Sequence, residues 1–272
     1  MKKILVILTC FNRKEKTIKC INSLSNGNKK LEFLFIVVDD NSKDGTVESL
    51  NTLPQDITIL SGDGNLYWAG GMRKGIEYCH YNKVKCDYVL YVNDDVDFYN
   101  GSIEKLVKQE DNKEVVIVGA TSNNVGELTY GALKHNGGRA KGLYSPVQPS
   151  SKEQCDTFNM NCVLMPKIIF DKMGNLDNVY HHALADLDYG FRISKSGYGI
   201  YISENYVGIC ENNPIKGTWK DDSLKRVQRL KIKESIKGAP FKPWFYYLKK
   251  NFGLMAAVKY SLSPYVRILM GK

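Results

Sequence analysis

Three clusters of acidic residues have the spacing and the setting to do chemistry. Val37–Ser42 reads V-V-D-D-N-S, Tyr91–Asp97 reads Y-V-N-D-D-V-D, and Ala185–Asp188 reads A-D-L-D. The first two follow apolar runs typical of buried strands, and the third opens a predicted helix. Ligands of open α/β sheets bind beyond the carboxyl ends of the strands, so we expect the carboxylates to converge on one crevice. Crowded carboxylates repel each other unless something neutralises them, and a hard divalent metal beside phosphates is the favoured cation.

The second cluster carries the pattern D-D-x-D. Alternation along an extended chain places Asp95 and Asp97 on one side and Asp94 on the other. One such carboxylate can bind Mg²⁺ or Mn²⁺ while the phosphates of a nucleotide supply other ligands. A solvated acidic turn is the alternative, and the buried-strand pattern of Tyr88–Val92 just before the cluster makes it the weaker one.

The first cluster places two adjacent acids, Asp39 and Asp40, at the end of a predicted strand. One of them should point into the crevice, where a carboxylate can accept hydrogen bonds from a base N–H or a ribose hydroxyl. Asp44 is interpreted as the cap of the helix that follows. At the end of the first predicted strand, Thr9 and Asn12 can also hydrogen-bond a base or ribose, or simply cap a helix.

A glycine-rich loop, Gly62–Arg73, leads into a helix and contains Asn65 and Trp68. Its backbone N–H groups could approach phosphates, and close helix packing is the alternative reason for the glycines. The loop matches neither the dinucleotide fingerprint nor the P-loop pattern. Trp68 is either a stacking platform for a ligand or a core aromatic.

The third cluster places Asp186 and Asp188 near the N-terminus of a predicted helix. The helix dipole favours charged carboxylates there and should keep Asp186 deprotonated, as a general base requires. Arg192 follows Asp188 by four residues, which predicts a salt bridge along the helix. His181 and His182 are interpreted as structural.

Strand-like and helix-like runs alternate through the first 120 residues. Strands are predicted at 4–9, 33–39, 57–61, 88–93 and 115–120, and helices at 14–24, 45–50, 72–81 and 102–110. This alternation predicts an α/β fold with a mostly parallel sheet covered by helices. Residues 121–160 are rich in Gly, Asn, Ser and Pro and predict a long irregular binding loop or lid. Order resumes with 161–165, helices near 167–173 and 186–196, and a strand at 199–203.

The basic charge of the chain is concentrated in its C-terminal part. Residues 216–272 contain 14 basic and 3 acidic residues, whereas the whole chain has a net charge of +9, so residues 1–215 are slightly acidic. The pattern from 221 onward predicts two helical stretches with Pro240 and Pro243 between them. We therefore expect a catalytic domain at 1–215 and a basic helical extension at 216–272.

Cysteine usage and hydropathy indicate a protein of the reducing cytosol. The seven cysteines are an odd number without a C-x-x-C pair, which argues against a zinc site or a disulfide framework. The apolar run after Met1 is too short for a signal peptide and lacks a cleavage site, and no run approaches the ~20 residues that span a bilayer.

Five blocks in this order resemble the family 2 inverting glycosyltransferases with a GT-A-type fold, especially the bacterial capsule, O-antigen and rhamnosyltransferase-like group. The resemblance covers roughly residues 3–210, and its carriers are Thr9–Arg13, Val37–Thr46, Gly64–Gly75, Val92–Phe98 and Asp186–Arg192. It implies a nucleotide-binding half at 1–120 and an acceptor-binding half at 121–215. It also implies transfer of a sugar from a UDP- or dTDP-linked donor to a hydroxyl of a glycan or lipid-linked glycan.

The resemblance implies a role for each matching residue. Thr9 and Asp40 would contact the base and ribose with Asp39 beside them, and Asp94 would lie near the ribose or sugar. Asp95 would hold Mg²⁺ or Mn²⁺ on the diphosphate, and Asp186 would deprotonate the acceptor. Asp97 falls outside the usual register of the metal motif.

Two departures from the family pattern concern the base and the metal. Many relatives have Glu before the base aspartate, where this chain has Ala185. Many also place a metal-binding His about twenty residues further on, where this chain reads Val207–Glu211 without a histidine. Asp95 is then the one metal ligand that the sequence supports.

The extension and the overall function leave alternatives open. Its interleaved aromatic and basic residues could lie on an anionic membrane, pack on the catalytic domain or bind a second subunit. A sugar-phosphate nucleotidyltransferase is an alternative enzyme. That class would be expected to have a glycine-rich, arginine-containing loop right after the first strand, whereas Thr9–Arg13 contains no glycine. A nucleic-acid-binding module is the other alternative, and an acidic crevice would repel phosphodiesters. We expect a cytoplasmic location, peripheral to the inner face of the plasma membrane if the extension binds lipid.

Overall fold

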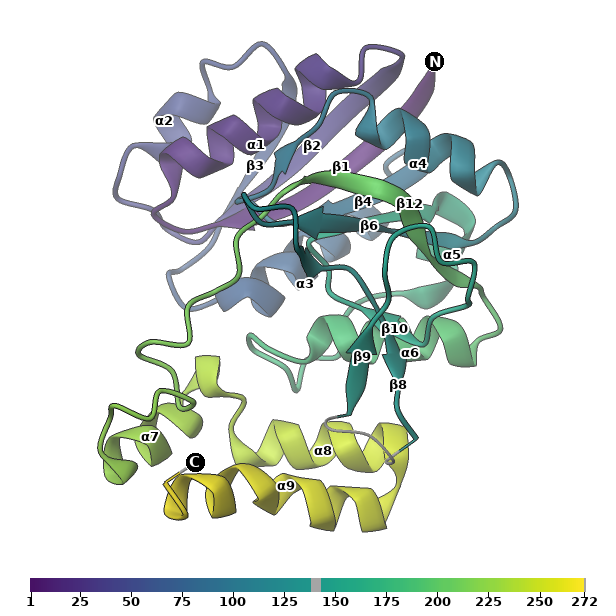
Figure 1. The fold of residues 1–272 in the computed structure, drawn as a ribbon. Coiled ribbons are helices and arrows are strands. Elements are labelled where there is room, and N and C mark those ends of the chain that lie inside the picture. Colours follow the sequence, from purple (N-terminus) through teal and green to yellow (C-terminus); the bar gives the residue numbers. More distant parts are fainter. Residues whose placement is uncertain (138–142, 272) are drawn as a thin grey trace.

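The computed structural model describes residues 1–137 and 143–271 (Figure 1). Its centre is a nine-stranded sheet in the order β3-β2-β1-β4-β11-β6-β12-β5, with β7 paired to β6. The strands are β1 (Lys2–Cys10), β2 (Leu31–Asp39), β3 (Asp56–Ser61), β4 (Tyr88–Val92), β5 (Asp97–Phe98), β6 (Val116–Ser122), β7 (Leu128–Tyr130), β11 (Cys162–Pro166) and β12 (Ile200–Ile209). β3, β2, β1 and β4 run parallel to one another, and β6 runs parallel to β12. β11 is antiparallel to both β4 and β6, and β5 and β7 are antiparallel to β12 and β6. The predicted mostly parallel sheet is confirmed.

Helices cover both faces of this sheet, which explains why its central strands are apolar without interruption. Ile4 and Val6 of β1 join a core with α1 (Lys14–Gly27), α2 (Thr46–Leu50) and α4 (Ser102–Glu110). Leu5 and Ile7 join a second core with α3 (Tyr67–Tyr81), α5 (Lys167–Met173) and α6 (Ala185–Lys195). Strands that are buried on both sides need apolar residues at every position rather than at alternate ones.

The segment 121–160 is more ordered than the sequence predicts. Besides β7, it forms β8 (Ala132–His135), β9 (Tyr144–Pro146) and β10 (Thr157–Phe158), which make a three-stranded antiparallel sheet in the order β10-β8-β9. The prediction of a wholly irregular segment was therefore wrong, because strands of two to four residues are too short to show a period. Part of that segment, 138–142, lies outside the described residues.

The glycine-rich loop is partly helix. α3 begins at Tyr67, so Gly70 and Gly71 lie in its first turns. A Cβ atom at Gly71 would lie 2.2 Å from Thr9 Oγ1, and one at Gly75 would lie 2.7 Å from the Ile7 side chain. These glycines let α3 pack directly on β1, which is the packing interpretation of the motif.

The C-terminal part forms three α-helices and a short 3₁₀ helix on one side of the main body (Figure 1). They are α7 (Arg226–Lys233), η1 (Ile236–Gly238), α8 (Phe241–Phe252) and α9 (Leu254–Leu269). Pro243 lies in the first turn of α8 rather than between helices, because a helix tolerates proline where no intrahelical N–H bond is needed. Among the described residues, no helix is long and apolar enough to cross a membrane.

Pro264, inside α9, couples the last two helices. A proline there cannot donate to the carbonyl four residues earlier, which belongs to Tyr260. The indole Nε1 of Trp244 in α8 donates to that carbonyl instead, at 3.3 Å. The α8–α9 hairpin is thus held by a specific polar contact in addition to apolar packing.

Candidate functional site

Two carboxylates after β4 share one cationic side chain. Arg13 Nη1 lies 2.9 Å from Asp94 Oδ1 and 3.0 Å from Asp95 Oδ2. Asp94 is buried, and that burial raises its pKa to about 6, with Arg13 acting in the opposite direction. The chain therefore presents carboxylate oxygens around one positive charge, at the edge where the sequence predicts a cation site.

Asp95 is the more accessible of the two acids, since its side chain is 20% exposed. The Sγ atom of Cys210 lies 3.6 Å from its Oδ1 atom. Burial, together with the nearby Asp95 charge, raises the pKa of the Cys210 thiol to about 12, so the sulfur is neutral at physiological pH. Cys210 lies in the stretch Val207–Glu211, where many relatives carry a histidine.

Arg13 and Cys210 contact the acidic cluster but are not among the candidate site residues predicted from the sequence. Arg13 ends the block Thr9–Arg13, just after the first predicted strand. A basic residue at the sheet edge where carboxylates are expected to converge could have been recognised as their partner. Cys210 gave no signal, because its contact with Asp95 spans 115 positions.

Backbone amides hold the carboxylates of Asp39 and Asp40, both of which are buried. Asp39 Oδ2 accepts from Ser42 N at 2.9 Å. Asp40 accepts from Gly64 N at 2.8 Å and from Tyr67 N at 3.1 Å. Asp40 thereby ties the end of β2 to the glycine-rich segment and to the start of α3.

Thr9 and Asn12 also make contacts within the protein. Thr9 Oγ1 donates to the Val38 carbonyl at 3.0 Å. Asn12 has a left-handed backbone (φ 51°), and its Oδ1 atom accepts from Lys43 N at 2.7 Å. The first contact joins the end of β1 to the end of β2, and the second joins the loop after β1 to the loop after β2, so the two loops form one continuous wall.

Trp68 and Asn65 differ in their environment. The Trp68 indole donates to Asn93 Oδ1 at 2.9 Å, and its partly buried ring packs against the core. This places Trp68 beside the acidic cluster that begins at Asp94. Asn65 is exposed on the loop before α3, where only its backbone contact with Asp63 is fixed.

Asp186 is partly buried in the first turn of α6. Burial raises its pKa above the ordinary value, opposed by hydrogen bonds from the Leu187 and Met160 backbones and from Asn159. The helix N-terminus was expected to stabilise the charged form of Asp186, and the backbone amides act in that direction, but burial acts the other way and has the larger effect on its pKa. The Asp186 charge also contributes to raised pKa values of the hydroxyls of Tyr144 in β9 and Tyr247 in α8, both mainly shifted by burial.

The Asp188–Arg192 salt bridge predicted from helical spacing does not form. Asp188 is buried and instead meets α8, where it accepts from Lys250 Nζ at 2.7 Å and from Asn251 Nδ2 at 3.0 Å. Arg192 donates to the Asn175 carbonyl at 2.5 Å and lies over the Tyr189 ring. The first turn of α6 therefore carries Asp188, which is held by α8, and Asp186, which is held by the Leu187 and Met160 backbones and by Asn159.

The segment before α6 reaches the other half of the site. The His181 carbonyl accepts from Ala69 N at 3.3 Å, and the His182 ring meets Tyr67 edge-on. Burial lowers the pKa of His182, with smaller contributions from Lys237 and Arg13. These contacts bring the base segment against the start of α3, and with it against the Asp40 wall.

The ionisation of Asp186 sets an expected pH dependence. The resemblance implies that Asp186 is the base, and with a raised pKa it stays protonated at pH values where an ordinary aspartate is charged, so activity should be lost as pH falls through that raised pKa. We expect the acid limb of kcat, measured at saturating donor, to have its midpoint above 3.8. Asp97→Asn serves as control, because Asp97 pairs with Lys19 on the surface and should leave the limb unchanged. A midpoint at or below 3.8 would contradict the assignment of Asp186 as the base.

The donors around Asp95 fit a hard divalent cation that other ligands complete. No group of three or more His, Cys, Asp or Glu side chains within 1–137 and 143–271 forms a metal cluster. Asp94 and Asp95 nevertheless already arrange their oxygens around a cation, the guanidinium of Arg13. Mg²⁺ in particular binds through one or two carboxylates plus phosphates and water.

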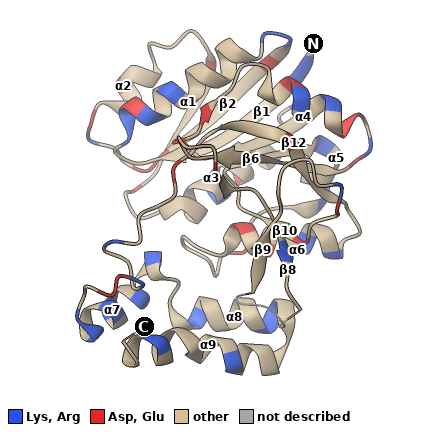
Figure 2. Cartoon of the chain, viewed as in Figure 1, with Lys and Arg blue, Asp and Glu red and all other residues tan. Residues whose placement is uncertain are grey.

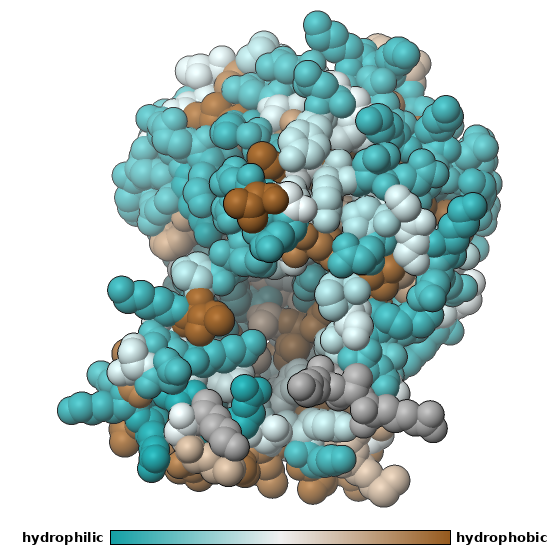
Figure 3. Space-filling view, in the orientation of Figure 1, coloured by the Kyte–Doolittle hydropathy of each residue, from teal (hydrophilic) through white to brown (hydrophobic). Residues whose placement is uncertain are grey.

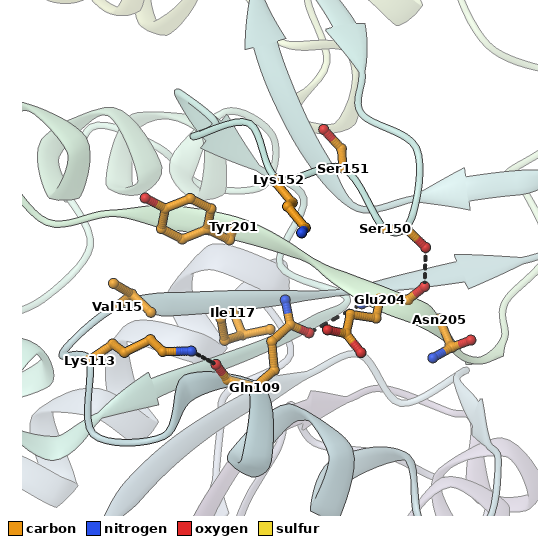
Figure 4. Close-up of a pocket in the computed structure, with 10 residues that line it drawn as sticks. All are labelled: Gln109, Lys113, Val115, Ile117, Ser150, Ser151, Lys152, Tyr201, Glu204 and Asn205. Atoms are coloured by element: carbon orange, nitrogen blue, oxygen red, sulfur yellow. Dashed lines mark hydrogen bonds between the residues drawn. The ribbon is translucent and has the colours of Figure 1, made fainter.

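A cavity of about 670 Å³ lies away from these residues (Figure 4). It is bordered by the early parts of β6 and β12, by α4 and by the loop at Ser150, and Ser150 Oγ donates to the Glu204 carbonyl at 2.8 Å. None of the predicted site residues lines it. A broader hollow separates the main body from the C-terminal helices, which form its lower margin (Figure 3).

Known proteins share both the sequence pattern and this fold. The sequence profile of Glycosyl transferase family 2 matches residues 5–173, more than half of the chain. A Pyrobaculum calidifontis mannosyltransferase solved with GDP-Man and Mn²⁺ has a TM-score of 0.60 at 13% identity, covering 99% of this chain and 74% of that one. Staphylococcus aureus TarS 1–349, solved with UDP-GlcNAc, has a TM-score of 0.58 at 14% identity, covering 98% and 79%. No curated protein sequence is significantly similar to this chain.

The profile match and the fold agree with the resemblance that the acidic blocks indicate. They leave the nucleotidyltransferase and the nucleic-acid-binding module without support. The chain belongs to glycosyl transferase family 2 and is a glycosyltransferase with a GT-A-type fold.

Proposed function

We propose that this enzyme transfers a sugar, with inversion, from a UDP- or dTDP-linked donor to a hydroxyl of a glycan or lipid-linked glycan. The observation that supports it most is the pair Asp94 and Asp95 around one cation, combined with a partly buried Asp186 on α6, just after the segment that contacts the start of α3. Residues 1–120 would supply the donor half and 121–215 the acceptor half. The GDP-Man and UDP-GlcNAc complexes of the structural neighbours support a nucleotide-sugar donor.

The donor would lie along the wall formed by the loops after β1, β2 and β3. Thr9, Asn12, Asp39 and Asp40 fix the shape of this wall through their contacts with backbone groups. The base and ribose then meet a surface that is already ordered, which reduces the entropy lost on binding. Asn65 would supply an exposed amide.

Trp68 would border the sugar end of this wall, since its indole is already fixed to Asn93, the residue before Asp94. An aromatic ring held in one orientation offers an apolar surface to a sugar or base without further ordering.

Asp95, with Asp94 beside it, would hold Mg²⁺ or Mn²⁺, which when bound neutralises the charge that develops on the leaving diphosphate. The Mn²⁺ complex of the mannosyltransferase supports this choice of cation. Arg13 holds the same oxygens and its side chain is 42% exposed, so it is free to turn from the carboxylates toward the diphosphate. In this proposal Arg13 offsets the negative charge of the two acids until the metal and the donor arrive.

Asp186 would take the proton of the acceptor hydroxyl as that oxygen attacks the anomeric carbon. The new C–O bond forms on the face opposite the leaving group, the bond from the anomeric carbon to the phosphate oxygen breaks, and the electron pair departs with the nucleoside diphosphate. The raised pKa of Asp186 makes its carboxylate a stronger base than an ordinary aspartate. Tyr144 and Tyr247 would border the acceptor on the same side.

The biological setting is part of the proposal. Synthesis of a bacterial surface polysaccharide, such as a capsule or O-antigen, uses acceptors of this kind, and the enzyme would work in the cytoplasm at the inner face of the plasma membrane. The strongly basic C-terminal extension supports a place beside anionic lipid (Figure 2).

The donor and the metal can be tested together. A panel of nucleotide-sugars with Mn²⁺ is first screened for a rise in melting temperature, because a ligand of the native state stabilises by mass action. For the best donor we expect Asp95→Ala, or chelation of divalent ions, to weaken binding about tenfold or more in calorimetry.

Asp97→Ala is the matched control, since it removes an acid of the same cluster that pairs with Lys19 instead. It should bind the donor like the wild type. Unchanged binding in Asp95→Ala would reject the metal role of Asp95, and absence of any stabilising nucleotide-sugar would reject the donor class.

A further inference from the structure

Helix α9 has two apolar faces, and only one of them is packed. Ala257, Ser261 and Ile268 are buried against the rest of the protein. A second set of aliphatic side chains, three or four residues apart, is at least half exposed. It consists of Met255 (89%), Val258 (53%), Leu262 (51%), Val266 (51%) and Leu269 (59%), and we name it the α9 stripe.

The spacing of the α9 stripe makes it one continuous surface. Steps of three, four, four and three residues keep side chains on one side of a helix. Leu254 and Met270, at the two ends of the helix, are 59% and 60% exposed and lengthen it. Apolar residues gather along this margin of the molecule (Figure 3). Contiguous apolar patches of this kind on a folded protein mark a surface that meets another apolar phase.

The charges around the α9 stripe are of one sign. Residues 241–269, which cover α8 and α9, contain five basic residues and no acidic one. Lys259 and Arg267 are exposed on α9 itself and lie on the same side of the stripe, Lys259 next to its edge and Arg267 about 100° further round the helix than Val266. The acidic residues of the extension lie outside these two helices, toward α7 (Figure 2).

The positive charge of α8 and α9 favours one of two possible partners of the stripe, a second copy of the chain or a membrane. A symmetric dimer through the stripe would bring together two copies of α8 and α9, each with five basic residues and no acidic one, and these like charges would repel. An anionic bilayer instead offers an apolar phase to the stripe and negative headgroups to Lys259 and Arg267. We propose that the α9 stripe docks on the surface of an anionic membrane, with its aliphatic side chains in the interfacial layer.

The docking surface differs from the one that the aromatic residues of the sequence suggest. Trp244 stacks on Tyr247, and its indole donates to the Tyr260 carbonyl, so these rings hold the hairpin together. Phe252 packs on His135 and Phe191 of the main body. The side chains of Trp244, Tyr247 and Phe252 therefore face inward, whereas the aliphatic side chains of the α9 stripe face outward.

The stripe stands in a fixed relation to the candidate base. α8 lies between α9 and the main body (Figure 1), and Lys250 of α8 bonds Asp177 and Asp188. Asp188 is two residues from Asp186 on α6. A membrane-bound α9 would thus hold the acceptor side of the site at a set orientation to the bilayer, which suits the lipid-linked acceptor of the proposed function, on which this last step rests.

The test is sedimentation of the full chain with vesicles of phosphatidylcholine containing about one third phosphatidylglycerol, at ~0.1 M salt. We expect the wild type to pellet with these vesicles and to remain in solution with pure phosphatidylcholine. The triple variant Val258→Ser, Leu262→Ser, Val266→Ser should bind at least tenfold more weakly. Lys259→Gln with Arg267→Gln should weaken binding roughly 30-fold, about fivefold for each lost charge.

The matched control replaces three exposed aliphatic residues elsewhere, as Val125→Ser, Ile168→Ser and Val227→Ser, and should pellet like the wild type. Equal pelleting of the stripe variant and the wild type would overturn the proposal, as would no pelleting of the wild type. A wild-type dimer in light scattering that becomes a monomer in the stripe variant, with vesicle binding kept, would assign the stripe to a second copy instead.

The proposed transferase activity is judged separately on the same preparations. Calorimetric binding of the nucleotide-sugar should be unchanged in the stripe, charge and control variants. If the wild type binds no nucleotide-sugar, the transferase proposal is contradicted. If the wild type does not pellet with the vesicles, the membrane proposal alone is contradicted.

Discussion

Replacing Asp186 with Asn is expected to lower kcat about a thousandfold or more, with the affinity for the nucleotide-sugar almost unchanged. General base catalysis contributes roughly 10²–10⁴ in rate, and an amide cannot accept the acceptor proton. Asn has the same shape, and its Oδ1 atom can keep the hydrogen bond from Leu187 N. The measurement is the transfer rate with the acceptor in excess, alongside donor calorimetry on the same protein.

The matched control is Asp97→Asn, which makes the same chemical change at a surface ion pair with Lys19. It should transfer at the wild-type rate. Equal turnover in Asp186→Asn and the wild type would remove Asp186 from the mechanism. A parallel loss of donor binding would instead make it a residue that shapes the site.

Replacing Lys250 with Met is expected to lower the free energy of unfolding by about 3 kcal/mol. Asp188 is 2% exposed, and removing the cation of a buried ion pair leaves an uncompensated charge. Asn251 still donates to Asp188, which keeps the effect at the lower end of the range for such losses. The measurement is a urea unfolding curve at neutral pH.

Lys249→Met is the matched control, because Lys249 is the exposed neighbour of Lys250 on the same helix. Its free energy of unfolding should lie within about 0.5 kcal/mol of the wild-type value. Adding Asp188→Asn to Lys250→Met removes the unpaired negative charge of Asp188 and should restore part of the lost free energy of unfolding. Similar curves for the two lysine variants would mean that the Asp188–Lys250 contact contributes little to stability.

The sheet was largely predictable because its strands are buried on both faces. β1, β2 and β4 follow from uninterrupted apolar runs, and their ends lie within two residues of the predicted ones. β8, β9 and β10 could not be found, because strands of two to four residues repeat too few times to show a period. The antiparallel direction of β11 depends on a connection through the small sheet and leaves no local mark in the sequence.

The candidate site was predictable where residues close in sequence act together. The pairs Asp39–Asp40 and Asp94–Asp95 can be recognised in the sequence because each follows an apolar run typical of a buried strand. Contacts between distant segments decide the rest. The partner of Asp188 lies 62 residues away, and the pKa of Asp186 depends on how completely other segments exclude water from it.

The contact of Asp188 in α6 with Lys250 and Asn251 in α8 limits which C-terminal extensions can replace this one during evolution. A C-terminal extension that touched the catalytic domain only through apolar surface could be exchanged between relatives with little loss. Here an incoming extension must bring a cation and an amide to Asp188, two residues from the candidate base. A chimera that replaces α8 without these two groups therefore also alters the turn of α6 that carries the candidate base.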